Sequence, residues 1–159
     1  MIGVLFVCTG NICRSPSAEG VFRAMVGRIG MSGAFRIDSA GTWNGHVGEP
    51  PSRQAIAVAA GRGYDLRDLR ARLATGADVA AFDHVLAMDR SHLRALRKLA
   101  PAGLADRPRL FMEHAPHAGP VEVSDPWGGG DADYERALDL IEAGCAGLLE
   151  RLRATSLGA

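Results

Sequence analysis

The segment of residues 4–16 constrains the fold more than any other part of the chain, because it joins a buried strand directly to a helix. Residues 2–7 form an apolar run with β-branched side chains, which is typical of a strand covered on both faces. After a short polar loop, apolar side chains recur at helical spacing as far as Ile29. The chain is therefore expected to begin with a strand, a tight loop and a helix over about residues 15–29.

The loop between this strand and this helix has the composition of a phosphate-binding loop. Backbone N–H groups at a strand-to-helix junction can point at one centre, and the helix N-terminus adds partial positive charge. The planar guanidinium of Arg14 can hold two phosphate oxygens, and Cys8 supplies a thiolate nucleophile aimed at phosphorus. Gly10 and Asn11 suit the unusual backbone angles of such a loop. The expected phosphate-binding residues are Thr9, Gly10, Asn11, Ile12, Cys13, Arg14 and Ser15.

This segment resembles the signature of the low-molecular-weight protein tyrosine phosphatases, Val-Cys-x-Gly-Asn-Ile-Cys-Arg-Ser-Pro. The similarity continues in residues 38–42, in residues 86–89 and in Asp125-Pro126-Trp127, in the order of the family and over nearly the whole chain. The resemblance implies a metal-independent phosphatase (CX5R loop) that hydrolyses phosphotyrosine in proteins through a phospho-cysteine intermediate. No cofactor is implied, and inorganic phosphate is the expected product and inhibitor.

The resemblance also implies roles for individual residues. Cys8 is the expected nucleophile, Arg14 the phosphate clamp and Asp125 the general acid and base, because cleavage of a phosphate monoester needs a proton on the departing oxygen. Ser15 is expected to hydrogen-bond to Cys8. Two further expectations concern support of the loop: Ser39 bonds to Asn11, and Asp89 braces the network around it.

The substrate pocket is expected to be lined by aromatic residues from two loops. Trp43 and His46 lie on a glycine-rich loop after the second predicted strand, and Trp127 follows the proposed acid. Family members commonly carry an aromatic residue at the position of Gly45, so the aromatic residue is displaced by two positions here. A loop tryptophan also commonly serves as a packing anchor, and the sequence leaves both interpretations of Trp43 open.

Cys13 has two possible roles. It is close enough in sequence to form a disulfide with Cys8, which would inactivate the enzyme reversibly and protect the thiolate from further oxidation. The alternative is a small apolar residue that fills the loop. Cys145 lies in the apolar stripe of the last predicted helix and is expected to be inert.

The remaining pattern predicts a single-domain α/β fold over residues 1–159. Strands alternate with helices, which favours an open parallel sheet of about four strands with helices on both faces, similar to a Rossmann fold, and ligands bind beyond the carboxyl ends of such strands. The phosphate-binding loop then follows the first strand. The later expected elements are strands over residues 34–39, 83–88 and 107–112, a helix capped by Ser52, a helix capped by Asp89, and a last helix over residues 131–153.

Composition excludes several other classes of protein. The chain of 159 residues has a formal net charge of zero, which argues against nucleic-acid or anionic-membrane binding. Three cysteines do not form a secreted disulfide framework, and the histidines and cysteines lack metal-site spacing. We see no signal peptide and no apolar run long enough to span a membrane. We therefore expect a cytoplasmic monomer that acts on a phosphotyrosine-containing protein.

Three rival functions stay open at this stage. A protein arginine phosphatase uses the same scaffold and tends to have threonine where this chain has Ile12, although the glycine-rich acid loop here resembles that subgroup equally. An arsenate reductase needs two further cysteines a few residues apart, which Cys145 alone does not provide. A phosphate-binding module without turnover would need neither the thiolate nor the acid.

Overall fold

Four parallel strands form the centre of the computed structural model, which describes residues 1–156. Their order is β2-β1-β3-β4, so the first strand lies inside the sheet and pairs with β2 on one side and β3 on the other. Because β1 is central, Val4, Leu5 and Phe6 are fully buried. The strands are β1 (Ile2–Cys8), β2 (Phe35–Gly41), β3 (His84–Ala87) and β4 (Pro108–Leu110).

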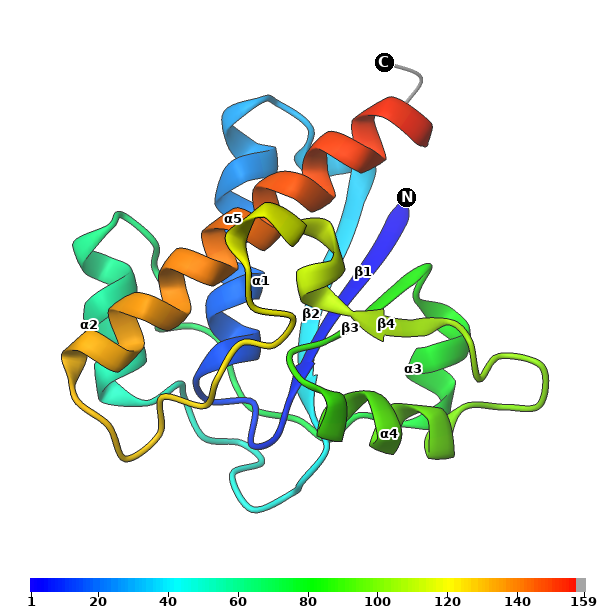
Figure 1. The fold of residues 1–159 in the computed structure, drawn as a ribbon, viewed down its shortest axis with the longest axis horizontal. Coiled ribbons are helices and arrows are strands. Elements are labelled where there is room, and N and C mark those ends of the chain that lie inside the picture. Colours follow the sequence, from blue (N-terminus) through cyan, green and yellow to red (C-terminus); the bar gives the residue numbers. More distant parts are fainter. Residues whose placement is uncertain (157–159) are drawn as a thin grey trace.

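Helices cover both faces of this sheet, as predicted (Figure 1). One layer contains α1 and α5 with α2 beside them, and the other contains α3 and α4. The described helices are α1 (Arg14–Arg28), α2 (Arg53–Gly61), α3 (Gly76–Ala81), α4 (Arg90–Leu99) and α5 (Asp131–Thr155). None of the helices within residues 1–156 combines the length and the apolar character needed to cross a membrane.

Alternation along β1 sends its side chains into two separate cores. Phe6 points toward the α1 and α5 layer, where its ring meets Phe22 and Phe111 edge to face, with centroids 5.9 and 5.6 Å apart. Leu5 and Val7 belong to the core under α3 and α4. Cys8 has the same parity as Phe6, so the end of the strand delivers its sulfur to the side on which α1 begins.

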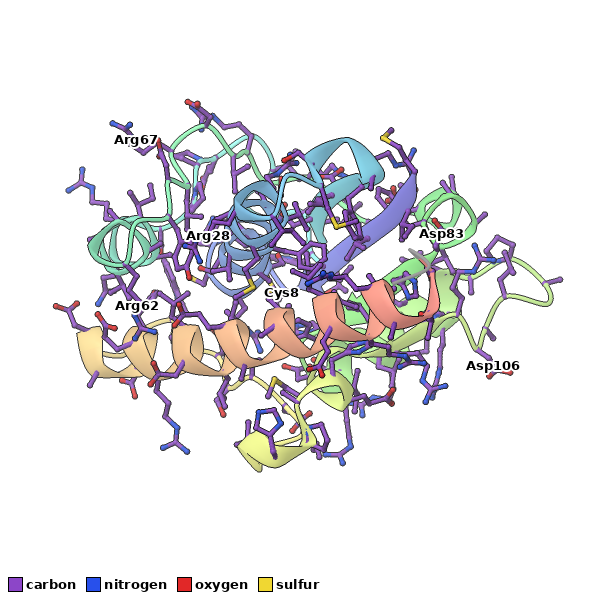
Figure 2. All side chains as sticks on the ribbon, turned by 90° about the horizontal axis from the view of Figure 1, so that it is seen from above. Cys8, Arg28, Arg62, Arg67, Asp83 and Asp106 are labelled. Atoms are coloured by element: carbon purple, nitrogen blue, oxygen red, sulfur yellow. The ribbon has the colours of Figure 1, made fainter. Side chains whose placement is uncertain are left out.

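Ion pairs connect α2 to the long last helix. Arg62, just after α2, binds Glu135, Asp139 and Glu142 of α5, and Figure 2 shows it beside the first turns of that helix. This contact fixes α2 next to the loop that precedes α5. That loop carries the predicted acid, so the position of α2 matters for the site.

The structure corrects two parts of the predicted element map. The fourth strand is only three residues long, because the chain turns into a 3₁₀ helix at Phe111–His114. Phe111 and Met112 are buried, but they lie in this helical turn and not in the strand. The short helix α3 was not predicted. The capping residues were predicted correctly: Ser52 accepts a hydrogen bond from the N–H of Ala55, and Asp89 accepts from Ser91 and His92.

Candidate active site

The loop between β1 and α1 presents unpaired amide groups. Within residues 1–156, no backbone N–H of residues 9–13 donates to a protein acceptor. Two carbonyls of the loop, in contrast, are paired: Thr9 accepts from the N–H of Trp43 at 3.0 Å, and Ile12 accepts from that of Ser52 at 2.8 Å. Unpaired N–H groups at a helix N-terminus are a binding site for an anion. The loop therefore has the properties predicted for a phosphate cradle.

Asn11 holds this loop in shape from behind. Its φ angle is 57°, in the left-handed region that asparagine tolerates better than most residues. Its amide nitrogen donates to Ser15 Oγ at 2.8 Å and to Ser39 Oγ at 2.9 Å, and its oxygen accepts from the N–H of Arg72 at 3.0 Å. The expected bond between Asn11 and Ser39 is present, and Asn11 is buried behind the loop.

A buried carboxylate extends the network behind Asn11. Ser39 Oγ donates to Glu19 Oε1 at 2.7 Å, and Arg23 binds the other oxygen of Glu19. Burial raises the pKa of Glu19, and the hydrogen bond from Ser39 and the charge of Arg23 oppose that shift. The polar groups under the loop are thus linked in one chain of hydrogen bonds, which restricts the loop to a single conformation.

Cys8 lies at the base of the cradle, 3% exposed. Its sulfur is 2.9 Å from Ser15 Oγ, which is the expected contact. Ser15 also accepts from Asn11, and its own hydroxyl hydrogen has two acceptors in reach, the sulfur at 2.9 Å and the carbonyl of Ala40 at 3.4 Å. Figure 2 shows Cys8 near the middle of the molecule, between α1 and the last helix in that view.

Arg14 is anchored through one nitrogen only. Its Nη1 donates to Asp89 Oδ2 at 2.9 Å and to the carbonyl of Val123 at 2.8 Å, and the side chain is 3% exposed. Within the described residues, Nε and Nη2 make no hydrogen bond, and Nη2 lies 3.7 Å from Asp125 Oδ2. The guanidinium therefore keeps one edge for a planar, two-pronged contact with phosphate.

Asp89 is the carboxylate that fixes Arg14, whereas the resemblance implied only that it braces the sheet or loop network. Burial alone would raise its pKa, but hydrogen bonds from Ser91, the neighbouring His92 and the Arg14 guanidinium outweigh burial and hold the pKa at about 2. Asp89 is therefore ionised at every pH at which the protein is expected to work. Its charge keeps Arg14 in place before any phosphate arrives.

Asp125 faces the cradle from the loop before α5. Its Oδ1 accepts the N–H of Trp127 at 3.0 Å, which leaves Oδ2 as the oxygen nearer Arg14. The carboxyl is half exposed. The amide of Gln54, in the first turn of α2, donates to the carbonyl of Gly129 at 3.1 Å and ties this loop to α2.

The aromatic residues predicted for the pocket wall form one row. The rings of Trp43 and His46 meet edge to face with centroids 5.4 Å apart, and His46 and Trp127 follow at 5.9 Å. His46 packs closely over Gly10, where an added Cβ would lie 2.9 Å from the imidazole. The wall is thus in direct contact with the phosphate-binding loop.

These elements enclose a cavity of about 130 Å³. Most of the residues predicted for the site line it, but Asn11 and Ser15 lie behind the loop and support it instead. Among residues 1–156, no group of three His, Cys, Asp or Glu side chains is arranged as a set of metal ligands. The residues lining the cavity are Cys8, Thr9, Gly10, Ile12, Cys13, Arg14, Trp43, His46, Asp125 and Trp127.

His92 and Glu19 belong to the supporting network but were not predicted as site residues. His92 is buried and hydrogen-bonds to Thr9, and Glu19 supports Ser39. A local signal existed for His92, because it stands three residues after the capping residue Asp89. The contact between His92 and Thr9, in contrast, joins residues 83 positions apart, and no local sequence pattern indicates it.

A buried cysteine beneath unpaired amides, with an arginine beside it and a carboxyl across the cavity, defines a cysteine-dependent phosphatase on an α/β scaffold. The sequence profile described as "Low molecular weight phosphotyrosine protein phosphatase" matches residues 3–157. The chain therefore belongs to the low-molecular-weight protein tyrosine phosphatase family.

Individual relatives agree with this assignment. A low molecular weight protein-tyrosine-phosphatase of Streptomyces coelicolor is 44% identical over 153 residues, which cover 94% of this chain and 93% of the relative. A protein tyrosine phosphatase from Entamoeba histolytica has the same fold, with a TM-score of 0.93 and 30% identity over 97% of this chain and 98% of the other. The arginine phosphatase YwlE also shares the fold, with a TM-score of 0.87 and 25% identity over 98% and 99%.

Proposed function

We propose that this phosphatase hydrolyses phosphotyrosine in proteins, with Cys8 as nucleophile, Arg14 as phosphate clamp and Asp125 as general acid and base. The observation that supports this most directly is that these three side chains line the same cavity as Trp43 and Trp127. The thiolate and the clamp suit any phosphate monoester, whereas the aromatic wall suits a flat phenol.

In the first step, the Cys8 thiolate attacks phosphorus, and the bond between phosphorus and the tyrosine oxygen breaks. The loop amides and the free edge of Arg14 hold the three non-bridging oxygens, whose charge they stabilise throughout the transfer. Protonated Asp125 gives its proton to the departing phenolate, so that tyrosine leaves as the neutral phenol. The products of this step are tyrosine, phospho-Cys8 and the Asp125 carboxylate.

In the second step, water attacks phospho-Cys8, and the bond between phosphorus and sulfur breaks. The Asp125 carboxylate takes a proton from the attacking water and returns to its acid form. The hydroxyl of Ser15, 2.9 Å from the sulfur, stabilises the departing thiolate. Inorganic phosphate is released, and because it fits the same cradle it is expected to inhibit competitively.

Specificity for tyrosine over arginine follows from the walls of the cavity. Ile12 lines the cavity, and its branched side chain crowds a guanidinium while packing well against a ring. Trp43 and Trp127 flank the mouth, more than half exposed, and offer faces on which an aryl group can stack. The structural likeness to an arginine phosphatase makes phosphoarginine the substrate to compare.

The test is hydrolysis of a phosphotyrosine peptide and a phosphoarginine peptide of the same sequence, without added metal. Wild type, Cys8→Ser and Ile12→Thr are compared, and Cys145→Ala serves as a matched cysteine control because it does not line the cavity. We expect strong phosphotyrosine turnover in wild type and Cys145→Ala, loss of turnover in Cys8→Ser, and a relative gain on phosphoarginine in Ile12→Thr. A wild-type preference for phosphoarginine would overturn the substrate assignment. No turnover of either peptide would mean that the protein binds phosphate without catalysing hydrolysis.

A second part of the proposal is reversible oxidation through Cys13. Both Cys8 and Cys13 are free thiols that line the same cavity. Burial raises the pKa of Cys13, against the effect of its hydrogen bonds with Ser52 and Tyr134, which favours the thiol form. A peroxide oxidises the Cys8 thiolate to the sulfenic acid; Cys13 sulfur then attacks that sulfur, the S–S bond forms, and the oxygen leaves as water.

Recovery from peroxide tests this step. Wild type treated with peroxide is expected to regain full activity with dithiothreitol, whereas Cys13→Ala is expected to lose activity irreversibly as Cys8 passes to higher oxides. Cys145→Ala, which removes the third thiol, should behave like wild type. Full recovery of Cys13→Ala would show that Cys13 has no protective role.

The proposed setting is the cytoplasm, where the protein acts as a monomer on phosphoprotein substrates. Cys8, Cys13 and Cys145 are unpaired thiols, which suits a reducing compartment. A net charge of zero gives no electrostatic attraction to nucleic acid or anionic membranes. Sedimentation of the purified protein tests the monomer.

A further inference from the structure

A buried histidine connects the two ends of the phosphate-binding loop. His92, in the first turn of α4, is 1% exposed, and its Nε2 lies 2.7 Å from the hydroxyl of Thr9, the residue after the nucleophile. Its Nδ1 lies 3.2 Å from the backbone nitrogen of Asp89, whose carboxylate binds Arg14. Thr9 and Arg14 are therefore held by one rigid unit outside the loop.

The hydrogen bonds determine which nitrogen of His92 carries the proton. The backbone N–H of Asp89 donates to Nδ1 at 3.2 Å. Asp89 Oδ1 is also 3.2 Å from Nδ1 but forms no hydrogen bond with the ring, so Nδ1 is an acceptor. Burial lowers the pKa of His92 to about 4, against the charge of Asp89, so the imidazole is neutral near pH 7 and has a single N–H group. That N–H is at Nε2, and it donates to Thr9 Oγ1.

This assignment directs the hydroxyl hydrogen of Thr9. Thr9 Oγ1 accepts from His92, and within residues 1–156 it has no other hydrogen-bond partner. Thr9 lines the cavity together with Cys8, so its hydrogen remains for a group bound there. An anionic phosphate oxygen is the acceptor that the adjacent amides favour.

We propose that His92 is a positioning residue of the phosphate-binding loop, which fixes the Thr9 hydroxyl as an additional donor to a bound phosphate oxygen. The proposal rests on the phosphatase function above, but phosphate binding tests it without turnover. His92 acts only through Thr9 and does not touch the substrate.

Two substitutions separate the two hydrogen bonds of His92. In His92→Gln, the side-chain amide reaches the position of Nε2 and still donates to Thr9. In His92→Asn, the shorter amide occupies the position of Nδ1, so it still accepts from Asp89 but does not reach Thr9. A role through Thr9 therefore predicts loss of phosphate affinity in His92→Asn and rescue in His92→Gln. A role limited to capping α4 predicts no loss in His92→Asn, because asparagine keeps the bond to the N–H of Asp89.

The dissociation constant of inorganic phosphate, measured by calorimetry, is the main readout. We expect Thr9→Val and His92→Asn each to weaken phosphate binding at least about 10-fold, the effect of one lost hydrogen bond to a charged group. His92→Gln should stay within about twofold of wild type. In the Thr9→Val background, His92→Asn should add nothing, because both substitutions remove the same interaction.

Several results would overturn the proposal. Effects that multiply in the double variant would mean that His92 does not act through Thr9. Unchanged phosphate affinity in Thr9→Val would mean that the Thr9 hydroxyl does not bind phosphate. This variant keeps His92 in the core, so it tests the proposal even if the His92 variants fail to fold. In wild type, ¹⁵N NMR of His92 must show the proton on Nε2.

Failure of the proposed function gives a different pattern. Without hydrolysis of any aryl phosphate by wild type, the enzyme assignment falls while the phosphate affinities still decide the role of His92. With normal hydrolysis and equal phosphate affinities in all variants, the enzyme assignment stands and the role of His92 falls.

Discussion

The indole ring of Trp43 lies over the backbone of Gly45, so that a Cβ atom at residue 45 would overlap the ring. Trp43 thus occupies the space that a side chain at residue 45 would fill, and it contacts His46 edge to face from there. The sequence left the role of Trp43 open. In the structure Trp43, displaced by two positions, lines the cavity, and Gly45 leaves room for its ring.

Gly45→Ala should therefore weaken aryl substrate binding. The new methyl group displaces the indole, and the loss of aromatic contact costs about 1 kcal/mol, or roughly a 5-fold rise in KM for an aryl phosphate. The chemical step should change little, because the loop and Arg14 are not touched. Gly33→Ala is the matched control, since an added Cβ there meets nothing within 4 Å. Equal KM values in the two variants would mean that Trp43 contributes nothing to binding.

Gln54→Ala should impair proton donation rather than phosphate binding. The hydrogen bond from Gln54 to the carbonyl of Gly129 ties the acid loop to α2, and without it Asp125 is held less firmly. A phenol that is a poor leaving group needs this proton more than p-nitrophenol does. We expect kcat to fall about 3- to 10-fold for phenyl phosphate and less for p-nitrophenyl phosphate.

Two comparisons complete the Gln54 experiment. Asp125→Asn should show the same dependence on the leaving group more strongly, because it removes the acid itself. Arg53→Ala removes an exposed neighbour on the same helix turn and should leave both rates unchanged. Equal losses on the two substrates in Gln54→Ala would argue that the tether acts on something other than the acid.

Much of the fold could be predicted because its signals are local. The buried strand, the loop and the first helix follow from one continuous pattern, and Ser52 and Asp89 are recognisable as caps from their neighbours. The fourth strand was predicted too long because Phe111 and Met112 are apolar in either conformation. Apolar character alone does not distinguish a strand from a buried 3₁₀ turn.

The catalytic candidates were identifiable because each one is chemically unusual at its position. The residues that support these candidates were harder to predict from the sequence. His92, Glu19 and Gln54 act through partners that the fold brings near from distant positions, and their side chains are ordinary for helices. Their contribution depends on burial and distance, which the sequence does not contain.

Substitution of Asn11 should separate backbone strain from lost hydrogen bonds. Asn11→Ala loses the bonds to Ser15, to Ser39 and from the N–H of Arg72, and it also places alanine at a φ of 57°. Asn11→Gly loses the same bonds without the strain, so the glycine variant should be more stable by about 1 kcal/mol in urea unfolding. Both variants should bind phosphate at least about 10-fold more weakly than wild type, by the loss of two buried hydrogen bonds. Wild-type phosphate affinity in Asn11→Gly would show that the loop holds its shape without Asn11.

The last prediction concerns the pH dependence of stability. His92 has a folded-state pKa of about 4, below the ordinary value of 6.5, because burial disfavours the charged form. Its contribution is present above pH 6.5, where both states are neutral, and is lost as pH falls from 6.5 toward 4, where the unfolded chain takes up the proton first. The loss amounts to at most about 3 kcal/mol over that range.

His92→Gln provides the comparison, because glutamine does not titrate. The free energy of unfolding, measured in urea between pH 7 and pH 4.5, should fall more steeply for wild type than for His92→Gln, by about 2 kcal/mol over the range. His84 and His114 have lowered pKa values from burial in both proteins, so their effects cancel in the difference. Asp89, with a pKa of about 2, stays ionised throughout. If the free energies of unfolding of the two proteins fell in parallel with pH, His92 would titrate at its ordinary pKa. The neutral imidazole proposed as the donor to Thr9 would then not persist at low pH.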